Sequence, residues 1–415
     1  MFKLTKKLSV TIFTVILLFS IGNAQGTSFH GYTRSYVGML TSGDNDFSIV
    51  QNTFDLDIEH SRKNVSFLVN PYIYQYPEKD LDFNLREAYM DIYFKAMDIR
   101  IGKQQIIWGS ADGVFITDVV SPKNLEEFLL RDFEEIRVGI TSLKADYYFG
   151  NKTLEFVWAP IFNPTKMPDK SSIWFPERNL SNAPIEPTID NSQRKVENNL
   201  ENSEVFAKFS SMGSLIDYEL MAGYMWDDEP TMHIQKTIDR ETQKPTSITA
   251  IPQHHRLSLA GGSFSTTLGP FVLRGEGAYY DGKYFQDSNQ PEGVVEKNYL
   301  HYLVGTDFTL FDVNLSTQFI QETILDYDDS IRDEQYKNTM TFLAKDDFLR
   351  QKLTVEFFSY VGLNNSDALL RPKVYYDLQD SFELLFGANL FLGEKGRFGQ
   401  YNENDMLYTK ITYTF

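Results

Sequence analysis

The sequence has no cysteine in 415 residues, so no disulfide stabilises the fold. Basic residues are few relative to acidic ones, 39 against 57, and the formal net charge is −18. Such an acidic chain is a poor partner for nucleic acid. Neither GxSxG nor HExxH occurs, and the histidines are scattered, so the sequence offers no catalytic residues and predicts neither an enzyme nor a cofactor.

Long apolar runs are also missing after the first 24 residues, so no transmembrane helix is expected. The N-terminus itself has a basic start, an apolar stretch from Leu8 to Ile21 and small residues at 22–24. This pattern is typical of a secretory signal peptide, and the apolar stretch is too short to span a bilayer. Export without disulfides favours a bacterial envelope. We expect residues 1–24 to be the signal peptide and 25–415 the mature domain.

Aromatic residues are abundant, at 15% of the chain with 24 Tyr and 33 Phe. They suit β-strands and the aromatic girdles of a membrane barrel. Apolar and polar residues alternate in segments of about ten residues, the pattern of transmembrane β-strands. Eighteen segments have it: 28–39, 48–60, 64–76, 83–94, 98–107, 136–149, 152–160, 203–211, 214–226, 255–267, 270–281, 298–310, 312–323, 337–345, 352–361, 368–378, 382–392 and 405–415. The patterns at 98–107 and 337–345 are weaker, so 16 strands is the alternative.

The connections between these segments sort by parity. Connections after even-numbered segments are short, with one to three residues at 61–63, 150–151, 212–213, 268–269 and 311, and several after odd-numbered segments are long, as at 161–202 and 227–254. Short turns at one end and long loops at the other are typical of outer-membrane barrels. The sequence therefore predicts an all-β, antiparallel, up-and-down barrel in the outer membrane of a Gram-negative bacterium. The termini and short turns would be periplasmic and the two longest Pro-containing loops extracellular.

The chain ends in the alternating stretch MLYTKITYTF. Its apolar face resembles the C-terminal signal by which the barrel-assembly machinery recognises outer-membrane proteins, and that face carries Leu407, Ile411, Tyr413 and Phe415. Outer-membrane lipid and lipopolysaccharide are the expected surroundings of this face. A lipid-facing stripe and a trimer interface have the same composition, so a homotrimer stays an open alternative.

Residues 108–135 lose the alternation and combine apolar residues with charges. A segment with this much apolar surface is expected to fold into the barrel and constrict its lumen. The spacing of Leu125, Phe128 and Leu129 after Ser121 or Asn124 predicts a short helix. The charged side chains would face the pore: Asp112, Asp118, Lys123, Glu126, Glu127, Arg131, Asp132, Glu134, Glu135 and Arg137.

The polar faces of the strands would line a water-filled lumen. They carry Asp55, Asp57, Glu59, Glu87, Asp91, Arg100, Arg274 and Lys373, together with Lys208, Arg371 and Lys410. Opposed charges across a constriction filter solutes by charge. Because both signs are present, the sequence predicts no strong selectivity.

The stretch LREAYMDIYF, followed by DIRIGKQQIIWGSADGVFITDVVSPKNLEEFLLRDFEEIRVG and GNKTLEFVWAPIFNP, resembles the domain-of-unknown-function 1302 family of Gram-negative outer-membrane proteins over about residues 83–165. The resemblance implies a porin-like barrel. Some members of that family are linked by context to lipid or hydrocarbon export beside inner-membrane pumps.

Three functions remain open at this stage. The first is a porin-like channel for passive or substrate-biased passage of small hydrophilic solutes, because eighteen strands leave room for an aqueous lumen. The second is a conduit or exporter component for apolar, lipid-like molecules, and the third is a non-conducting, surface-binding barrel.

No metal site is expected: the pair His254–His255 could bind a metal, but solvent-facing side chains are the preferred interpretation.

Overall fold

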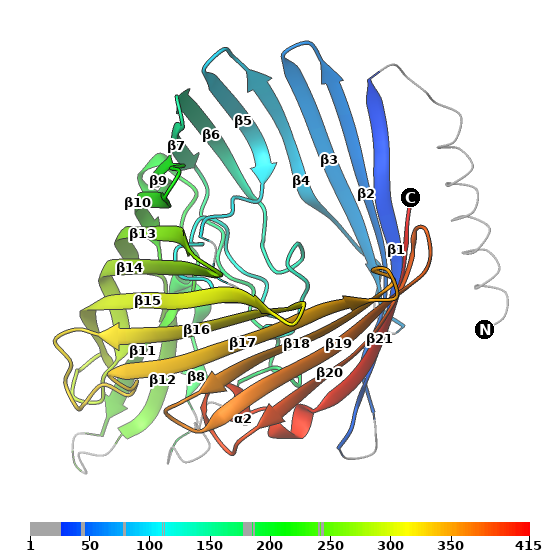
Figure 1. Ribbon diagram of the computed structural model, residues 1–415. Coiled ribbons are helices and arrows are strands. Elements are labelled where there is room, and N and C mark those ends of the chain that lie inside the picture. Colours follow the sequence, from blue (N-terminus) through cyan, green and yellow to red (C-terminus); the bar gives the residue numbers. More distant parts are fainter. Residues whose placement is uncertain are drawn as a thin grey trace.

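Figure 1 shows the computed structural model, an antiparallel barrel with almost no helix. It describes residues 26–42, 46–77, 80–109, 111, 113–176, 185, 187–239, 241 and 245–415. The predicted signal peptide and Asp112 therefore lie outside the described residues. No helix in these ranges is long and apolar enough to cross a membrane.

Eighteen strands form one sheet: β1 (Thr27–Leu40), β2 (Phe47–Arg62), β3 (Val65–Gln75), β4 (Asp82–Tyr93), β5 (Met97–Gln104), β6 (Ile140–Phe149), β7 (Lys152–Ala159), β9 (Glu204–Ser211), β10 (Ile216–Trp226), β13 (Arg256–Leu268), β14 (Phe271–Gln286), β15 (Val294–Leu310), β16 (Val313–Ile324), β17 (Tyr336–Phe348), β18 (Leu353–Gly362), β19 (Asp367–Gln379), β20 (Phe382–Leu392) and β21 (Met406–Thr414). Each pairs antiparallel with its neighbours along the chain, and β1 also pairs with β21, which closes the barrel. The weaker candidates β5 and β17 are paired on both sides, which rules out 16 strands.

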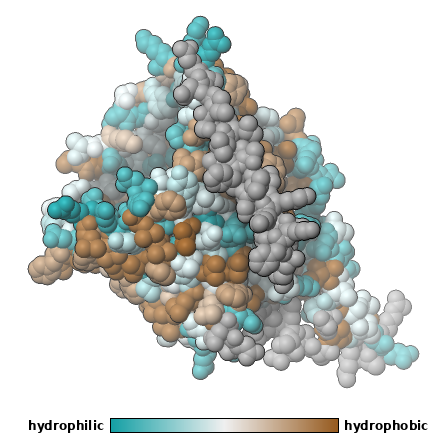
Figure 2. Space-filling model, turned by 90° about the vertical axis from the view of Figure 1, so that its right-hand side faces the viewer, coloured by the Kyte–Doolittle hydropathy of each residue, from teal (hydrophilic) through white to brown (hydrophobic). Residues whose placement is uncertain are grey.

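Side chains alternate between the two faces of the wall, as the period of two requires. On β21, Leu407 and Ile411 are 52% and 48% exposed, whereas Tyr408 and Lys410 are 7% and 6% exposed. Figure 2 shows hydrophobic side chains gathered on the outer wall in this view, with hydrophilic ones mainly toward the edges. The apolar faces therefore point outward and the polar faces inward.

The connections follow the predicted parity. The short turns have residues in the left-handed region, such as Phe311 and Asp312 (φ 49° and 70°) between β15 and β16. Two of the long connections contain strands, which was not predicted: β11 (Thr231–Ile238) and β12 (Pro245–Gln253) form a hairpin, and β8 (Thr188–Ile189) joins it in parallel. The remaining short elements are η1 (Asn191–Gln193), η2 (Leu200–Asn202), α2 (Gly396–Gly399) and η3 (Asn402–Asn404).

The connection from β5 to β6, residues 105–139, runs through the middle of the barrel (Figure 1, cyan to teal). We call it the inward segment. The sequence predicted that this segment folds inward, and the structure confirms it. The short helix predicted near Leu125 is not present among the described residues. Phe128 takes a left-handed φ of 55°, and the backbone nitrogen of Leu125 donates to the oxygen of Lys166. These contacts turn the chain, and Phe128 packs on the ring of Tyr401 instead of continuing a helix.

Candidate functional site: the inward segment and the barrel lumen

The inward segment contacts the barrel wall on several sides. Near its start, Thr117 donates from its backbone nitrogen and its hydroxyl to Glu276 of β14, both over 2.7 Å. Tyr360 of β18 donates to the backbone oxygen of Gly113 over 2.6 Å. Arg371 of β19 donates to the backbone oxygens of Leu129 and Leu130 over 3.0 and 3.2 Å. The segment therefore crosses the lumen and is held at well-separated strands.

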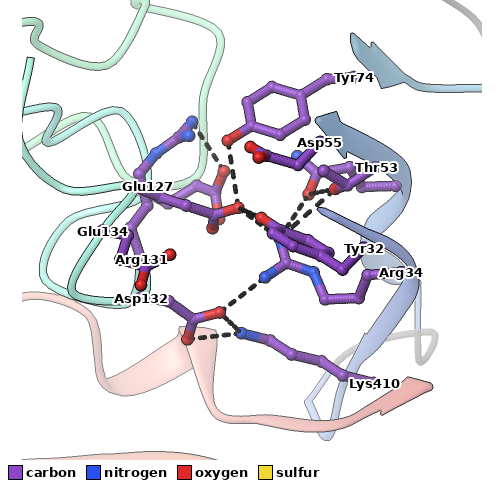
Figure 3. Close-up of polar contacts among 12 residues, drawn as sticks. Tyr32, Arg34, Thr53, Asp55, Tyr74, Glu127, Arg131, Asp132, Glu134 and Lys410 are labelled. Atoms are coloured by element: carbon purple, nitrogen blue, oxygen red, sulfur yellow. Dashed lines mark hydrogen bonds and ion pairs between the residues drawn. The ribbon is translucent and has the colours of Figure 1, made fainter. Parts of the chain in front are cut away.

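A further attachment is a group of charged and tyrosine side chains at β1, β3 and β21, drawn in Figure 3. Lys410 Nζ lies 2.7 and 2.6 Å from the two carboxylate oxygens of Asp132, and Arg34 Nη1 lies 2.7 Å from the second. Arg34 Nη2 lies 2.7 Å from Glu135 Oε1, which also accepts from Tyr32 and Tyr74 over 3.1 and 3.2 Å. We call this group the lumen clamp: Tyr32, Arg34, Tyr74, Asp132, Glu135 and Lys410.

The Arg34–Glu135 pair of the lumen clamp is deeply buried, whereas the side chain of Asp132 is 44% exposed. Arg34 and Glu135 each have only 6% of the side chain exposed. Charges buried this deeply require partners, and removing one partner is costly. Burial alone would raise the pKa of Asp132, but Lys410 and Arg34 outweigh it and hold that pKa well below its ordinary value of 3.8. Asp132 is therefore ionised at neutral pH.

A second ionic group holds the segment to itself. Arg137 donates from Nε to Asp118 Oδ2 over 2.7 Å, and Lys123 donates to the backbone oxygens of Asp118 and Ser121 over 2.8 and 2.5 Å. All three charged residues are below 9% exposed. Burial lowers the pKa of Lys123, and nearby Asp118 opposes that effect. This group gives the segment a fixed shape between its wall contacts.

Apolar side chains fill the space between the segment and one side of the wall. Trp108, Ile116 and Val120 pack with inward-facing residues of the strands, and Trp108 is 1% exposed. Its indole nitrogen donates to Glu155 Oε1 over 2.5 Å. A second apolar group surrounds Trp174 and Tyr401. The interior is therefore divided into apolar regions and a polar region beside the lumen clamp.

The polar region contains a pocket between β3, β4, β5 and the inward segment. Its charged lining is five cations and one carboxylate: Arg86, Lys103, Arg131, Arg137, Lys166 and Glu135. The three arginines pair with Asp55, Glu127 and Asp118, respectively. Among the described residues, no ion pair joins Lys103 or Lys166 to a carboxylate. We call this the basic pocket.

The predicted charges of the segment separate into groups in the structure. Asp118, Lys123 and Arg137 contact one another, and Asp132 and Glu135 belong to the lumen clamp. Arg131 pairs with Glu126 and Glu127 over 3.3 and 2.8 Å, and burial raises the pKa of Glu127. Glu134 offers its backbone oxygen to Arg86 over 3.0 Å.

The predicted lumen residues face inward, and most are paired along the wall. Arg100 binds Asp91 over 2.7 Å, Arg274 binds Asp307 over 2.7 Å, and Lys373 binds Glu356 over 3.0 Å. Glu87 accepts from the backbone nitrogen of Gln105, at the start of the inward segment. Asp55 binds Arg86, and Asp57 and Glu59 lie on the same face of β2 as Asp55.

Sequence reasoning missed Arg34 and Arg86. The alternation of β1 places Arg34 on the same face as Tyr32 and Tyr36, so its inward orientation was available from the sequence. Arg86 lies beside a bulge, where the register shifts between Asn70 and Pro71, and a bulge breaks the alternation.

In the described ranges, no three His, Asp or Glu side chains gather to hold a metal ion.

The closed, eighteen-stranded antiparallel barrel with an inward segment is the fold of outer-membrane porins. Among solved structures, it is similar to Pseudomonas aeruginosa OccK8 (OprE), with 10% identity, a TM-score of 0.57, and coverage of 94% of this chain and 98% of that one. It is also similar to OccK2 (OpdF) of the same organism in complex with glucuronate, with 12% identity, a TM-score of 0.56 and the same coverage. These likenesses show the fold.

The chain belongs to the family described as protein of unknown function (DUF1302), whose model matches residues 57–415. The resemblance noted over 83–165 is thus confirmed, and it extends to the end of the chain. No curated protein matches the sequence.

Proposed function

We propose that this protein is an outer-membrane channel for small hydrophilic solutes, in which the inward segment narrows the lumen. The observation that carries the proposal is the lumen clamp, in which Arg34 and Lys410 of the wall hold Asp132 of the segment. Fixed charges placed at a narrow point select solutes by size and charge. The likeness to outer-membrane porins supports the same function.

We further propose that the channel favours anionic solutes. The basic pocket presents Lys103 and Lys166 without a carboxylate partner among the described residues, and guanidinium groups lie beside them. Lysine and arginine bind carboxylate and phosphate oxygens through charge-assisted hydrogen bonds. The similar barrel OccK2 was solved in complex with glucuronate, a sugar that carries a carboxylate.

A liposome-swelling assay tests this function. Vesicles containing the refolded protein are diluted into isotonic solutions of neutral sugars and sugar acids of increasing size. We expect uptake that falls with solute size, and faster uptake of a sugar acid than of its neutral counterpart. No uptake above that of empty vesicles would contradict the channel, and equal rates for the two sugars would contradict only the anionic preference.

The apolar side chains of the interior favour a second candidate, a conduit for apolar molecules. Trp108 and Val114, with Ile107 and Phe133, line a pocket beside Glu276. A barrel that binds apolar solutes would take up a lipophilic fluorescent probe from water, and Trp108→Ala would reduce that uptake. A protein that neither conducts nor binds such a probe would fit the third alternative, a surface-binding barrel.

The expected orientation follows from the same reasoning. We infer that the termini and short turns are periplasmic and that the β11–β12 hairpin is extracellular. The outward exposure of Leu407 and Ile411 supports a role for this face in barrel assembly or lipid contact. A homotrimer stays a prediction, to be tested by the mass of the protein in detergent.

A further inference from the structure

Two histidines from separate segments face each other beside the β14–β15 connection. His233 lies on β11, and His255 lies between β12 and β13. Their Nε2 atoms are 2.9 Å apart, and the two rings are 5.1 Å apart between centroids. The solvent-facing interpretation of the pair His254–His255 is therefore wrong: His254 is buried and bonds the backbone oxygen of Asp227, and His255 turns toward His233.

The contact of His233 with Glu292 determines which nitrogen of His233 carries a proton. Its Nδ1 lies 3.1 Å from Glu292 Oε2, and an ionised carboxylate only accepts hydrogen bonds. Nδ1 of His233 therefore carries the proton, and its Nε2 presents a lone pair toward His255. A metal-binding histidine in proteins has this arrangement, in which the second ring nitrogen donates to a carboxylate.

His255 is fixed by its surroundings. Its ring stacks on Tyr284 with centroids 3.7 Å apart and planes 15° apart, and Tyr284 donates to Glu296 over 3.1 Å. Its backbone oxygen accepts from Asp227 over 2.7 Å. A ring held on its face and at its backbone keeps its Nε2 directed at His233.

The spacing of the two nitrogens is close to that of two ligands of one cation. Two imidazoles at a zinc–nitrogen distance of about 2.0–2.1 Å and a tetrahedral angle have nitrogens roughly 3.3 Å apart. The observed 2.9 Å is a hydrogen-bond distance, at which Nε2–H of His255 donates to Nε2 of His233; a bound ion would replace that proton, and the two nitrogens would lie roughly 0.4 Å further apart. The carboxylates of Glu292 and Glu296 add negative charge nearby without competing for the same nitrogens.

We propose that His233 and His255 form a site for one divalent transition-metal ion, with water or a solute oxygen at the remaining positions. Imidazole nitrogens suit zinc, nickel and copper rather than magnesium or calcium. The ion would join the β11–β12 hairpin to the end of the barrel, where the backbone nitrogen of Ile234 already donates to the oxygen of Glu292 over 2.7 Å. This site is independent of the lumen clamp and of the proposed channel.

Isothermal titration of the refolded protein, prepared without a polyhistidine tag, tests the site with zinc and nickel chlorides. We expect one ion per chain, with no heat from magnesium. His233→Ala and His255→Ala should each abolish that binding, and Glu292→Gln should weaken it by about 10–100-fold. His254→Ala is the matched control and should bind as the wild type does.

A wild type that binds neither zinc nor nickel would overturn the proposal. So would binding that persists in both His233→Ala and His255→Ala. A folded barrel changes its electrophoretic mobility when it is heated, and this change verifies the folding of each variant. A loss of metal binding is assigned to the site only in a variant that passes this check.

Discussion

Lys410 of the last strand and Asp132 of the inward segment are 278 positions apart in the chain, and Lys410 Nζ lies 2.6 Å from Asp132 Oδ2. Arg34 of the first strand binds the same carboxylate. The two cations come from β1 and β21, the strands whose pairing closes the barrel. The segment is thus attached where the first and last strands meet, and barrel closure assembles its binding site.

Arg34→Ala should destabilise the barrel strongly. The substitution leaves Glu135 buried without its cation, and breaking a buried pair costs about 3–5 kcal/mol. Unfolding by urea in detergent micelles measures this loss. The matched control is Lys337→Ala, because Lys337 and Asp333 are 42% and 38% exposed and such pairs contribute less than about 1 kcal/mol. Equal losses for the two variants would show that the lumen clamp adds no stability.

Trp108→Ala should loosen the segment on its opposite side. The indole is 1% exposed, and deleting a buried Trp costs about 3–5 kcal/mol. Glu155 also loses the hydrogen bond it accepts from the indole nitrogen. We expect unfolding to reach its midpoint at a lower urea concentration, and we expect noisier channel currents. An unchanged midpoint would contradict the packing described for this side of the lumen.

The lumen clamp should resist mild acid. Asp132 has a pKa held below its ordinary value of 3.8, so its contribution to stability is complete above that value and is lost only as the pH falls through the still lower folded pKa. Glu127 has the opposite shift, because burial raises its pKa, and it takes up a proton first. Folding favours that protonated form, so Glu127 gives no acid-induced loss of stability.

We therefore expect the contacts of Asp132 to persist from pH 7 to pH 4, so the difference in conductance between the wild type and Asp132→Asn should stay constant over that range at fixed ionic strength. A wild-type conductance that reaches the level of Asp132→Asn between pH 7 and pH 5 would indicate that the clamp opens in mild acid, contrary to the lowered pKa of Asp132. Asp132→Asn removes the carboxylate charge at every pH and shows what current an opened clamp gives.

The basic pocket should determine whether the channel conducts anions in preference to cations. In a salt gradient, the reversal potential of the wild type should indicate anion preference, and the double variant Lys103→Glu with Lys166→Glu should move it toward cations. Lys195→Glu is the control, since Lys195 is exposed and does not line this pocket. A reversal potential that is the same in wild type and double variant would exclude the pocket from the ion path.

The missing cysteines allow an independent test of the same pocket. Lys166→Cys would be the only thiol in the chain, and an anionic methanethiosulfonate reagent would place a negative charge there. We expect the reaction to reduce anion current. A reaction that proceeds, as verified by mass, without any change in current would contradict a position on the ion path.

The wall of the barrel was predictable from the sequence because its signal is local. Alternation within about ten residues identified all eighteen strands of the main sheet, and the sorting of short and long connections indicated an outer-membrane barrel. The β11–β12 hairpin was missed because its long, Pro-containing connection lacks a clear alternation. The predicted helix near Leu125 was wrong because a backbone contact with Lys166 overrides the local spacing.

The site was only partly predictable. Alternation shows that Lys410 faces the lumen, but it does not show that Asp132 lies opposite, since that contact depends on the path of the inward segment. The same limit applies to His233 and His255, which come together only when the hairpin folds onto the barrel. Contacts between distant segments depend on tertiary structure, which periodicity does not encode.

The most direct test of the channel is single-channel conductance in a planar bilayer, comparing the wild type with the double variant Asp132→Asn, Glu135→Gln. These substitutions keep the side-chain shapes and remove the two charges that bind Arg34 and Lys410. We predict steady ohmic steps for the wild type and larger or fluctuating steps for the variant. Silence in both proteins would contradict the account of an aqueous channel narrowed by the inward segment.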